Sequence, residues 1–275
     1  MPTATFKRRC LARRSRSGQL GHRLKLKTAV ITGAAQGIGL QTAKLLDSLG
    51  WSLALIDLQP VATQQYKYAL ALTGDITDEK FVAEAAAKTM KKFGRVDALV
   101  NNAGISNISS ALDTTTEKYR QVLEVNLVAP FMLAKQFGKI MLDAGSGAIV
   151  NVASVAGLQG VADRSAYNAS KHGLVGLTRT LAVEWGARGV RVNAVCPGWV
   201  KTEMDHKDQA GGSYTDRDIT DHVPMARFAR PEDIAEAIAW LCDDTKSGFV
   251  NGVALPIDGG WTTDGSWQSL RLRQR

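Results

Sequence analysis

Short apolar runs alternate with helical stretches along almost the whole chain. The runs consist of Val, Ala, Leu and Ile with few polar interruptions, which is typical of strands that are buried on both faces. Strands of this kind that are separated by helices form a parallel sheet with helices on both faces. The predicted strands cover residues 29–31, 51–57, 68–75, 96–104, 147–154, 190–198 and 252–260.

The helical stretches complete one doubly wound α/β domain around a seven-stranded parallel sheet. No proline-rich linker divides residues 26–275, so we expect a single domain there. Residues 201–225 are polar and irregular, as expected of a mobile lid. The predicted helices cover residues 38–49, 78–94, 116–143, 165–189 and 231–244.

The positive charge of the chain lies before this domain. Of 34 Lys and Arg residues, nine fall within residues 1–27, which contain no acid. The other 25 basic residues face 26 acidic ones, and this near-neutral body argues against a nucleic-acid-binding surface. Residues 1–25 are therefore a separate basic arm. A disordered extension, an organelle transit peptide and a segment that contacts an anionic partner remain open for it.

The composition also excludes several classes of protein. No apolar run is long enough to cross a bilayer, and the arm lacks the apolar stretch of a secretory signal. The three cysteines, Cys10, Cys196 and Cys242, are scattered and show no metal-ligand spacing. They are expected to be reduced thiols of a cytoplasmic protein without a metal site, unless the arm directs the chain to an organelle.

A glycine-rich turn, Thr32–Gly39 (TGAAQGIG), lies between the first predicted strand and the first helix. Small residues there let the backbone approach a pyrophosphate, to which the helix N-terminus offers free N–H groups. Asp57 ends the next strand, where a carboxylate can bind both ribose hydroxyls and repel a 2′-phosphate. No Arg or Lys lies in the turn or next to Asp57, which favours NAD over NADP. Taken alone, the glycines could simply form a turn, and Asp57 could be a solvated acid.

Tyr167 and Lys171, in the segment YNASK, are spaced to lie one turn apart on one face of a predicted helix. A free phenol titrates at about pH 10, and a neighbouring cation favours the phenolate. The pair would thus suit acid–base chemistry on a hydroxyl group. An isolated pair with this spacing is more often a solvated surface pair, so the rest of the chain has to decide.

Seven features, in order and at their spacings, resemble the short-chain dehydrogenase/reductase family from Leu26 to Trp261. The resemblance implies a Rossmann-type fold and an NAD-dependent oxidoreductase, which transfers a hydride between the cofactor and a secondary alcohol or its ketone. The features are TGAAQGIG at 32–39, Asp75, NNAG at 101–104, Asn126, Ser154, YNASK at 167–171 and PGWVKT at 197–202.

The same resemblance implies roles for single side chains. Tyr167 would be the acid/base, and Lys171 would lower its pKa and bind the nicotinamide ribose. Ser154 would bind the substrate oxygen, and Asn126 would hold a water for proton relay. The implied cofactor contacts are Gly33, Gln36, Gly37, Ile38, Gly39, Asp57, Asp75, Ile76, Asn102, Ala103, Gly104, Tyr167, Lys171, Pro197, Gly198, Val200 and Thr202.

Substrate recognition is expected in the segment after Ser154 and in the lid. Gln159 joins Ser154 and Tyr167 as a predicted substrate contact, and Asp163 and Arg164 are further polar candidates. The lid is richer in hydrogen-bonding groups than in apolar ones. This composition favours a small polar substrate such as a polyol, a sugar or a hydroxy acid.

Two other functions stay open. A 3-oxoacyl-thioester reductase would normally use NADPH, and Asp57 counts against that reading. A non-catalytic dinucleotide-binding regulator would use the basic arm to reach nucleic acid. The segment FVNGVALPIDGGW at 249–261 resembles the end of bacterial 3-oxoacyl-(acyl carrier protein) reductases and of many sugar and polyol dehydrogenases. In those proteins the last helix and strand pack across a twofold axis, which implies a homotetramer.

Overall fold

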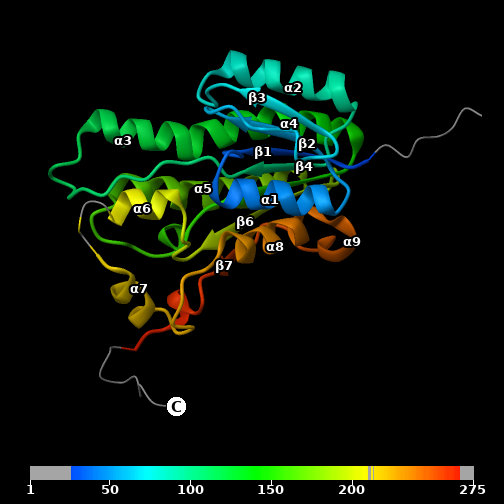
Figure 1. The fold of residues 1–275 in the computed structure, drawn as a ribbon. Helices are drawn as coiled ribbons and strands as arrows, with labels where there is room; N and C mark the ends of the chain where they lie inside the picture. The colour runs from blue at the N-terminus through cyan, green and yellow to red at the C-terminus, as the bar shows by residue number, and fades with distance from the viewer. Residues whose placement is uncertain (1–25, 210–211, 213, 267–275) are drawn as a thin grey trace, which may run out of the picture.

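The computed structural model describes residues 26–209, 212 and 214–266, and these contain the predicted sheet (Figure 1). All seven strands are parallel and lie in the order β3-β2-β1-β4-β5-β6-β7, which confirms the predicted fold class. The basic arm and Cys10 lie outside the described residues. The strands are β1 (Thr28–Thr32), β2 (Ser52–Asp57), β3 (Ala69–Thr73), β4 (Ala98–Asn101), β5 (Gly147–Val152), β6 (Val190–Pro197) and β7 (Ala254–Ile257).

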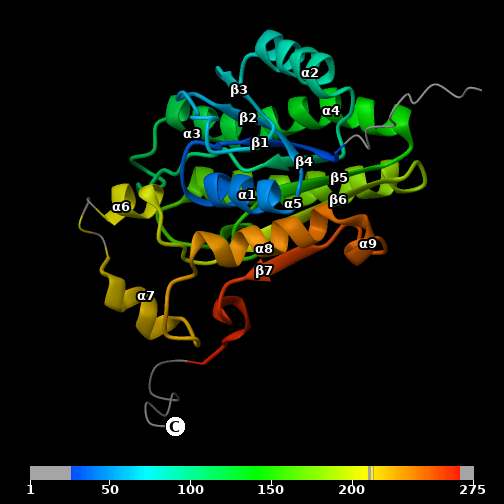
Figure 2. The ribbon, with the colours of Figure 1, turned by 45° about the vertical axis from the view of Figure 1, so that its right-hand side comes forward.

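Helices cover both faces of the sheet, with α1 and α8 on one face and α2, α4 and α5 on the other (Figure 2). Successive residues of a strand point to opposite faces. In β1, Val30 packs into the core under α2, α4 and α5, while Ala29 and Ile31 pack under α1 and α8. The covering helices are α1 (Gly37–Ser48), α2 (Glu79–Phe93), α4 (Ala129–Ala144), α5 (Ser165–Gly186) and α8 (Pro231–Cys242).

Local signals in the sequence set the ends of these helices. α2 begins after Asp78, whose carboxylate caps the first turn, and ends at Gly94 in the left-handed conformation, with φ at 72°. α8 begins with Pro231, and the Asp233 carboxylate accepts the Arg230 N–H at 2.9 Å. That hydrogen bond is the largest cause that lowers the pKa of Asp233, to about 2.

The single helix predicted over residues 116–143 is in fact three segments. α3 (Thr116–Leu123) leads into the π-helical turn η1 (Glu124–Val128), and α4 follows. Apolar residues recur at helical spacing in both α3 and α4, so the periodicity of the sequence could not reveal the π-helical turn between them. Single π-helical turns are frequent at functional sites.

The irregular lid predicted over residues 201–225 was also wrong in part. It contains two short helices, α6 (Glu203–Gln209) and α7 (Asp216–His222). α7 begins with a capping box in which Thr215 and Asp218 each bond the other's backbone. The Thr-x-x-Asp pattern was a readable signal for that helix.

The order of the strands defines where a ligand can bind. The chain runs outward from β1 to β3 and then returns to place β4 on the other side of β1. In open parallel sheets, ligands bind at the carboxyl ends of the strands where the order reverses. The segments predicted to form the site all follow these carboxyl ends, at the left of Figure 1.

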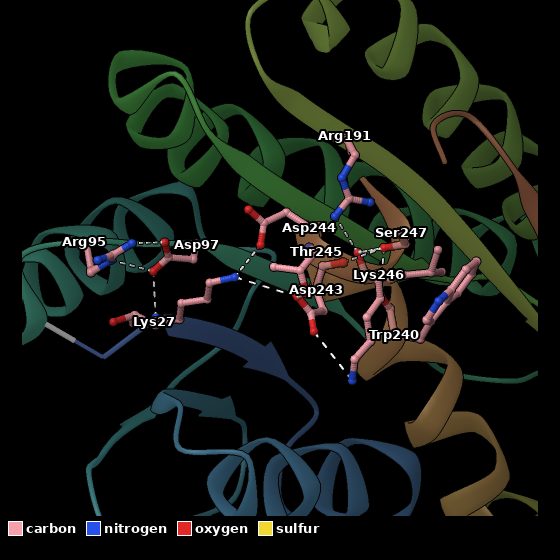
Figure 3. Close-up of polar contacts among 12 residues, drawn as sticks. Lys27, Arg95, Asp97, Arg191, Trp240, Asp243, Asp244, Thr245, Lys246 and Ser247 are labelled. Carbon is pink, nitrogen blue, oxygen red and sulfur yellow. Dashed lines mark hydrogen bonds and ion pairs between the residues drawn. The ribbon is translucent and has the colours of Figure 1, made fainter. Parts of the chain in front are cut away.

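Charged side chains hold the opposite, amino edge of the sheet (Figure 3). The Asp97 carboxylate accepts the Thr28 N–H and the Arg95 Nε–H, both at 2.8 Å. Lys27 forms an ion pair with Asp244, in the segment after α8. These contacts join the start of β1 to the start of β4 and to the end of the domain's last long helix.

Two further findings concern membranes and metals. Across residues 26–209, 212 and 214–266, every helix is too short or too polar to span a membrane. The same residues contain no group of three His, Cys, Asp or Glu side chains arranged to hold a metal ion. Cys196 and Cys242 are buried free thiols, and burial raises their pKa to about 11 and about 12.

We predict that Asp97→Ala lowers the free energy of unfolding by about 2–3 kcal/mol, because it removes the carboxylate that accepts the buried Thr28 N–H and pairs with Arg95. Turnover should be unchanged in the folded variant, because Asp97 lies at the amino edge. Denaturant unfolding measures the loss. The control is Asp143→Ala, which breaks an exposed pair with Lys139 and should cost about 0.5 kcal/mol or less. Equal losses in the two variants would contradict the assignment.

Candidate active site

Gly33, in the turn between β1 and α1, and Gly39, in the first turn of α1, have no room for a side chain. A Cβ on Gly39 would lie 2.1 Å from the Gly33 carbonyl oxygen, and one on Gly33 would lie 2.8 Å from Asn102 Nδ2. Gly33 also has a φ of +65°, which side chains rarely tolerate. Asn102 Nδ2 donates to the carbonyl oxygens of Thr32 and Gly33 at 2.9 and 3.0 Å. The turn is therefore pinned to the end of β4.

The N-terminus of α1 opens toward this turn. Within the described part of the chain, Gln36 makes no side-chain cap, and the first turn of α1 holds no acid. The N–H groups of Gly37, Ile38 and Gly39 are thus left without a side-chain acceptor. Such N–H groups, at the positive end of a helix, bind anionic groups such as a pyrophosphate.

Asp57 is held in a fixed position at the end of β2. Its Oδ2 accepts the Ala35 N–H and its Oδ1 accepts the Gln59 N–H, both at 2.9 Å. Because Ala35 belongs to the glycine-rich turn, the carboxylate lies beside that turn. A fixed carboxylate here can still accept hydroxyl hydrogen bonds through its remaining lone pairs.

The ends of β3 and β4 bring further predicted contacts to the same edge. Asp75 follows β3, and its carboxylate accepts the Thr77 N–H at 2.9 Å. The Ile76 side chain is buried in the core, which leaves its backbone to face a ligand. Asn102–Gly104 follows β4, and its first two N–H groups bond the Thr32 hydroxyl.

The last predicted cofactor segment, Pro197–Thr202, leaves the end of β6. Gly198 donates its N–H to the Ile257 carbonyl oxygen at 3.0 Å, so the segment is tied to β7. The Thr202 hydroxyl accepts the Asp205 N–H at 3.4 Å, at the start of α6. Thr202 thus lies where the sheet ends and the lid begins.

Three elements bring the predicted catalytic side chains together. Tyr167 and Lys171 lie one turn apart in α5, and Ser154 follows β5 at the start of the 3₁₀ turn η2 (Val155–Gly157). Lys171 Nζ lies 5.5 Å from the centre of the Tyr167 ring and donates to the Val152 carbonyl oxygen at 2.9 Å. The Ser154 hydroxyl lies near enough to the Tyr167 phenol to lower its pKa.

A glycine that the sequence analysis missed makes this approach possible. A Cβ on Gly157 would lie 2.7 Å from the carbonyl oxygen of Lys171. Only a residue without a side chain lets η2 pack this closely on α5, and that packing brings Ser154 to Tyr167. The sequence carried no signal for it, because Gly157 looks like an ordinary turn glycine.

Burial governs the protonation of the Tyr167 and Lys171 pair. Lys171 is 4% exposed, and desolvation lowers its pKa to about 8. Burial raises the pKa of the Tyr167 phenol above its ordinary value, while the Ser154 hydroxyl and the charge of Arg164 oppose that rise. The expected lowering of the Tyr167 pKa by Lys171 is therefore not found: the net direction in this structure is upward.

Asn126 is fully buried within the π-helical turn η1. Its Oδ1 accepts the Ile105 N–H at 2.9 Å, and its Nδ2 donates to the Ile105 carbonyl oxygen and to the Ser170 hydroxyl. A Cβ placed on Gly104 would lie 3.1 Å from Asn126 Oδ1 and 3.6 Å from Lys171 Nζ. The structure therefore brings Asn126 and Lys171 to the same point beside β4.

The substrate side of the site contains an aromatic cluster that the sequence analysis missed. The Trp199 ring lies 5.0 Å from that of Tyr214 and 5.8 Å from that of Trp261, which lies 4.0 Å from His222. Gln159 is half-buried, just after η2. The cluster joins the lid to the segment after β7. Its members are scattered in the sequence, and no spacing could have grouped them.

Comparison with known proteins agrees with this geometry. A short-chain dehydrogenase profile, described as “Enoyl-(Acyl carrier protein) reductase”, matches residues 33–262. The chain belongs to the short-chain dehydrogenase/reductase family. The chain is 38% identical over 248 residues to the D-threitol dehydrogenase of Mycolicibacterium smegmatis. The match covers 87% of this chain and 94% of that relative.

Two solved structures extend the comparison. A candidate NAD(P)-dependent gluconate 5-dehydrogenase from Beutenbergia cavernae, with NADP bound, is 38% identical, with a TM-score of 0.81 over 88% of this chain and 98% of its own. A 3-ketoacyl-(acyl-carrier-protein) reductase from Brucella melitensis, in complex with NADH, is 32% identical, with a TM-score of 0.80 over 86% of this chain and 98% of its own.

The family binds a nicotinamide dinucleotide, and this chain has a cradle that fits one. Glycines that have little or no room for a Cβ lie at the carboxyl ends of β1 and β4. The uncapped N-terminus of α1 supplies N–H groups for the pyrophosphate. As an oxidoreductase of alcohol and ketone substrates, the protein needs this cradle close to Tyr167, and both lie at the same edge of the sheet.

We predict that Gly39→Ala weakens dinucleotide binding by about 10-fold or more, because the added Cβ displaces the Gly33 carbonyl and reshapes the turn. Fluorescence or calorimetric titration with NAD⁺ measures the loss. The matched control is Gly176→Ala, an exposed position of α5 where a Cβ meets nothing within 4 Å, and it should leave binding unchanged. Unchanged affinity in Gly39→Ala would rule out the turn as the pyrophosphate cradle.

Proposed function

We propose that this protein is an NAD-dependent dehydrogenase/reductase that interconverts a small polar secondary alcohol and its ketone. The observation that carries the proposal is the convergence of Ser154, Tyr167 and Lys171 at the carboxyl edge of the sheet, beside the glycine cradle. Hydride transfer from an alcohol carbon requires a group that takes the hydroxyl proton. Tyr167 is assigned that role.

The side chains divide the chemistry among them. Ser154 donates its hydroxyl hydrogen bond to the substrate oxygen, which holds that oxygen beside the Tyr167 phenol. Tyr167 takes the hydroxyl proton in oxidation and returns it to the carbonyl oxygen in reduction. The bound dinucleotide supplies the hydride acceptor or donor. Lys171 and Asn126, which meet beside Gly104, are assigned to proton relay with a water.

The raised pKa of Tyr167 bears on whether the site favours ketone reduction or alcohol oxidation. A protonated phenol can give its proton to a carbonyl oxygen, which serves ketone reduction. Alcohol oxidation needs the phenolate, so a positive charge must oppose the effect of burial. Protonated Lys171 and the cationic ring of the oxidised cofactor are the charges assigned to this task.

The preference for NAD rests on Asp57. A carboxylate fixed at the end of β2 suits two ribose hydroxyls and repels a 2′-phosphate. The turn at residues 32–39 and the neighbours of Asp57 offer no Arg or Lys to attract that phosphate. The solved relatives hold NADP in one case and NADH in the other, so the family by itself does not decide the cofactor.

Polar side chains near the lid support a small polar substrate. Lys201 pairs with Asp205 at 3.1 Å and with Asp216, and Arg164 pairs with Asp208. Paired charges of this kind offer donors and acceptors to hydroxyl groups without a net charge. Two relatives, a threitol dehydrogenase and a candidate gluconate 5-dehydrogenase, are named for polyhydroxy substrates of this class.

We also propose that the protein is a homo-oligomer, and a homotetramer in particular. Large apolar side chains are exposed on several helices and after α8, where they would be solvated in a monomer. Trp240 of α8 is 38% exposed, and Phe249, which precedes β7, is fully exposed. Phe131 of α4 and Val183 of α5 lie on a second face. Light scattering of the purified chain tests this proposal.

A 3-oxoacyl-thioester reductase is the second candidate. Its support is the Brucella melitensis relative, which is named as a 3-ketoacyl-(acyl-carrier-protein) reductase. Absorbance of the reduced nicotinamide separates the two functions. NAD⁺ and NADP⁺ are tested with polyols, sugars and secondary hydroxy acids, and NADH and NADPH with a 3-oxoacyl thioester. Turnover of polar alcohols with NAD⁺ supports the first candidate, and turnover of the thioester alone supports the second.

Tyr167→Phe keeps the ring and removes the proton carrier. We predict a loss of about 10²–10⁴-fold in kcat, with an unchanged Kd for NAD⁺. Steady-state kinetics and NAD⁺ titration measure the two effects separately. Tyr68→Phe, at a half-exposed tyrosine before β3, is the control and should keep full activity. Turnover of Tyr167→Phe near that of the control would show that another group moves the proton.

Asp57→Ala should weaken the selectivity for NAD⁺ over NADP⁺. We expect the ratio of the two kcat/KM values to fall by roughly 10–100-fold, because two charge-assisted hydrogen bonds are lost and the 2′-phosphate is no longer repelled. Glu84→Ala, on the exposed surface of α2, is the control. An unchanged ratio would mean that another group recognises the ribose.

A further inference from the structure

A nearly buried ion pair joins α6 to the residue before α5. Arg164 Nη1 lies 3.0 Å from Asp208 Oδ2, and the two side chains are 10% and 17% exposed. The Ser106 hydroxyl completes a triangle, since it accepts from Arg164 at 3.0 Å and donates to Asp208 at 3.1 Å. Arg164 also lies over the Trp199 ring, at 5.5 Å from its centre. The guanidinium is therefore held from three sides.

The backbone fixes this arginine as well. Asp163, just before it, has a φ of 57°, which is uncommon for a residue with a side chain. The Asp163 carbonyl oxygen accepts the Ser109 N–H at 2.8 Å, and Ser109 forms an isolated β-bridge with Arg164. Strained backbone persists where the surroundings over-determine it, and often at functional sites. The backbone thus fixes the position of Arg164, and α6 brings Asp208 into contact with it.

α6 itself rests on polar contacts. Asp205 is its buried side chain among those described, and it pairs with Lys201 and accepts the Tyr214 hydroxyl. Asp208 supplies the contact to Arg164. A helix held mainly by ion pairs and hydrogen bonds docks less firmly than one held by an apolar face. The pair with Arg164 is its link to the catalytic helix.

The two charges of the pair act on Tyr167 in opposite directions. Arg164 lies three residues before Tyr167, and its positive charge favours the phenolate, while the negative charge of Asp208 disfavours it. The other groups that bear on the phenol are the Ser154 hydroxyl and Lys171. Lys201 and Asp205 form a second pair in the same region, with Tyr214 bonded to Asp205. The docked Asp208 thus offsets the charge of Arg164.

We propose that Arg164 is a positioning residue that couples the docking of α6, through Asp208, to the proton affinity of the Tyr167 phenol. With α6 docked, Tyr167 holds its proton more firmly. When Asp208 leaves, the uncompensated charge of Arg164 stabilises the phenolate. The inference rests on the proposed function, because it assigns the acid/base role to Tyr167.

A simple structural brace would behave differently. Asp208→Asn and Arg164→Gln both break the same ion pair, so a brace predicts that they loosen α6 and change activity in the same direction. Electrostatic coupling predicts opposite effects on the proton transfer. The opposite signs are the readout that a structural role does not produce.

The experiment measures kcat/KM for alcohol oxidation against pH at saturating NAD⁺, where the rate rises as Tyr167 loses its proton. We expect Asp208→Asn to move the midpoint to lower pH and Arg164→Gln to move it to higher pH, each by roughly 0.5–1 on the pH scale. The double variant should lie near the wild type, because the two effects cancel. Hydrogen exchange of the α6 amides should be faster in both single variants.

The control is Asp143→Asn, which changes an exposed carboxylate paired with Lys139 at the end of α4 and should leave the midpoint in place. Shifts in the same direction for the two test variants, or no shift while exchange in α6 is faster, would overturn the coupling.

If the wild type turns over no alcohol or ketone, the proposed function fails and the coupling is tested directly. The absorbance of tyrosinate is then followed against pH in each variant. The titration of the same variant carrying Tyr167→Phe is subtracted, which leaves the titration of Tyr167. Opposite movements of the Tyr167 titration support the coupling, and identical titrations overturn it.

Discussion

The turn between β1 and α1 passes so close to the end of β4 that Gly33 and Gly39 have no space for a Cβ, and the Asn102 amide fills what remains. This contact of backbone on backbone sets the direction in which α1 leaves the sheet. The N-terminus of α1, which the Gln36 side chain does not cap, lies at the carboxyl edge where the strand order reverses. The dinucleotide cradle and the packing of α1 beside α8 both depend on that backbone contact.

A second pair of constraints lies at Tyr167 and Lys171. Burial disfavours the phenolate of one and the ammonium of the other, so it raises the pKa of Tyr167 and lowers that of Lys171 to about 8, which moves two values that are close together in water apart. The charges that surround them, including Arg164 and any bound cationic ring, decide where the proton rests. Gly157 lets the segment after β5 pack closely on α5 at this pair.

Much of this could be predicted from the sequence. Apolar runs located all seven strands, because strands buried on both faces leave a continuous signal, and the motif spacing named the residues that meet at the carboxyl edge. What escaped prediction depends on tertiary contacts. The helices α6 and α7 are short and polar. The π-helical turn is flanked by segments with the usual helical spacing of apolar residues. The ion pair of Arg164 with Asp208 joins residues that are 44 positions apart in the sequence. The direction of the Tyr167 pKa also needed burial, which local spacing does not report.

The π-helical turn at Glu124–Val128 has a further meaning for the history of the chain. One additional residue in a helix rotates everything after it by about 100°. Leu133, Phe137 and Met141 of α4 lie in the core, while Asn126 meets Lys171 beside β4. A homologue shorter by one residue here would have to give up one of these two alignments. The length of this segment is thus set by the position of Asn126 at one end and by the core packing of α4 at the other. Insertions and deletions should be rarer in this segment than elsewhere in the domain.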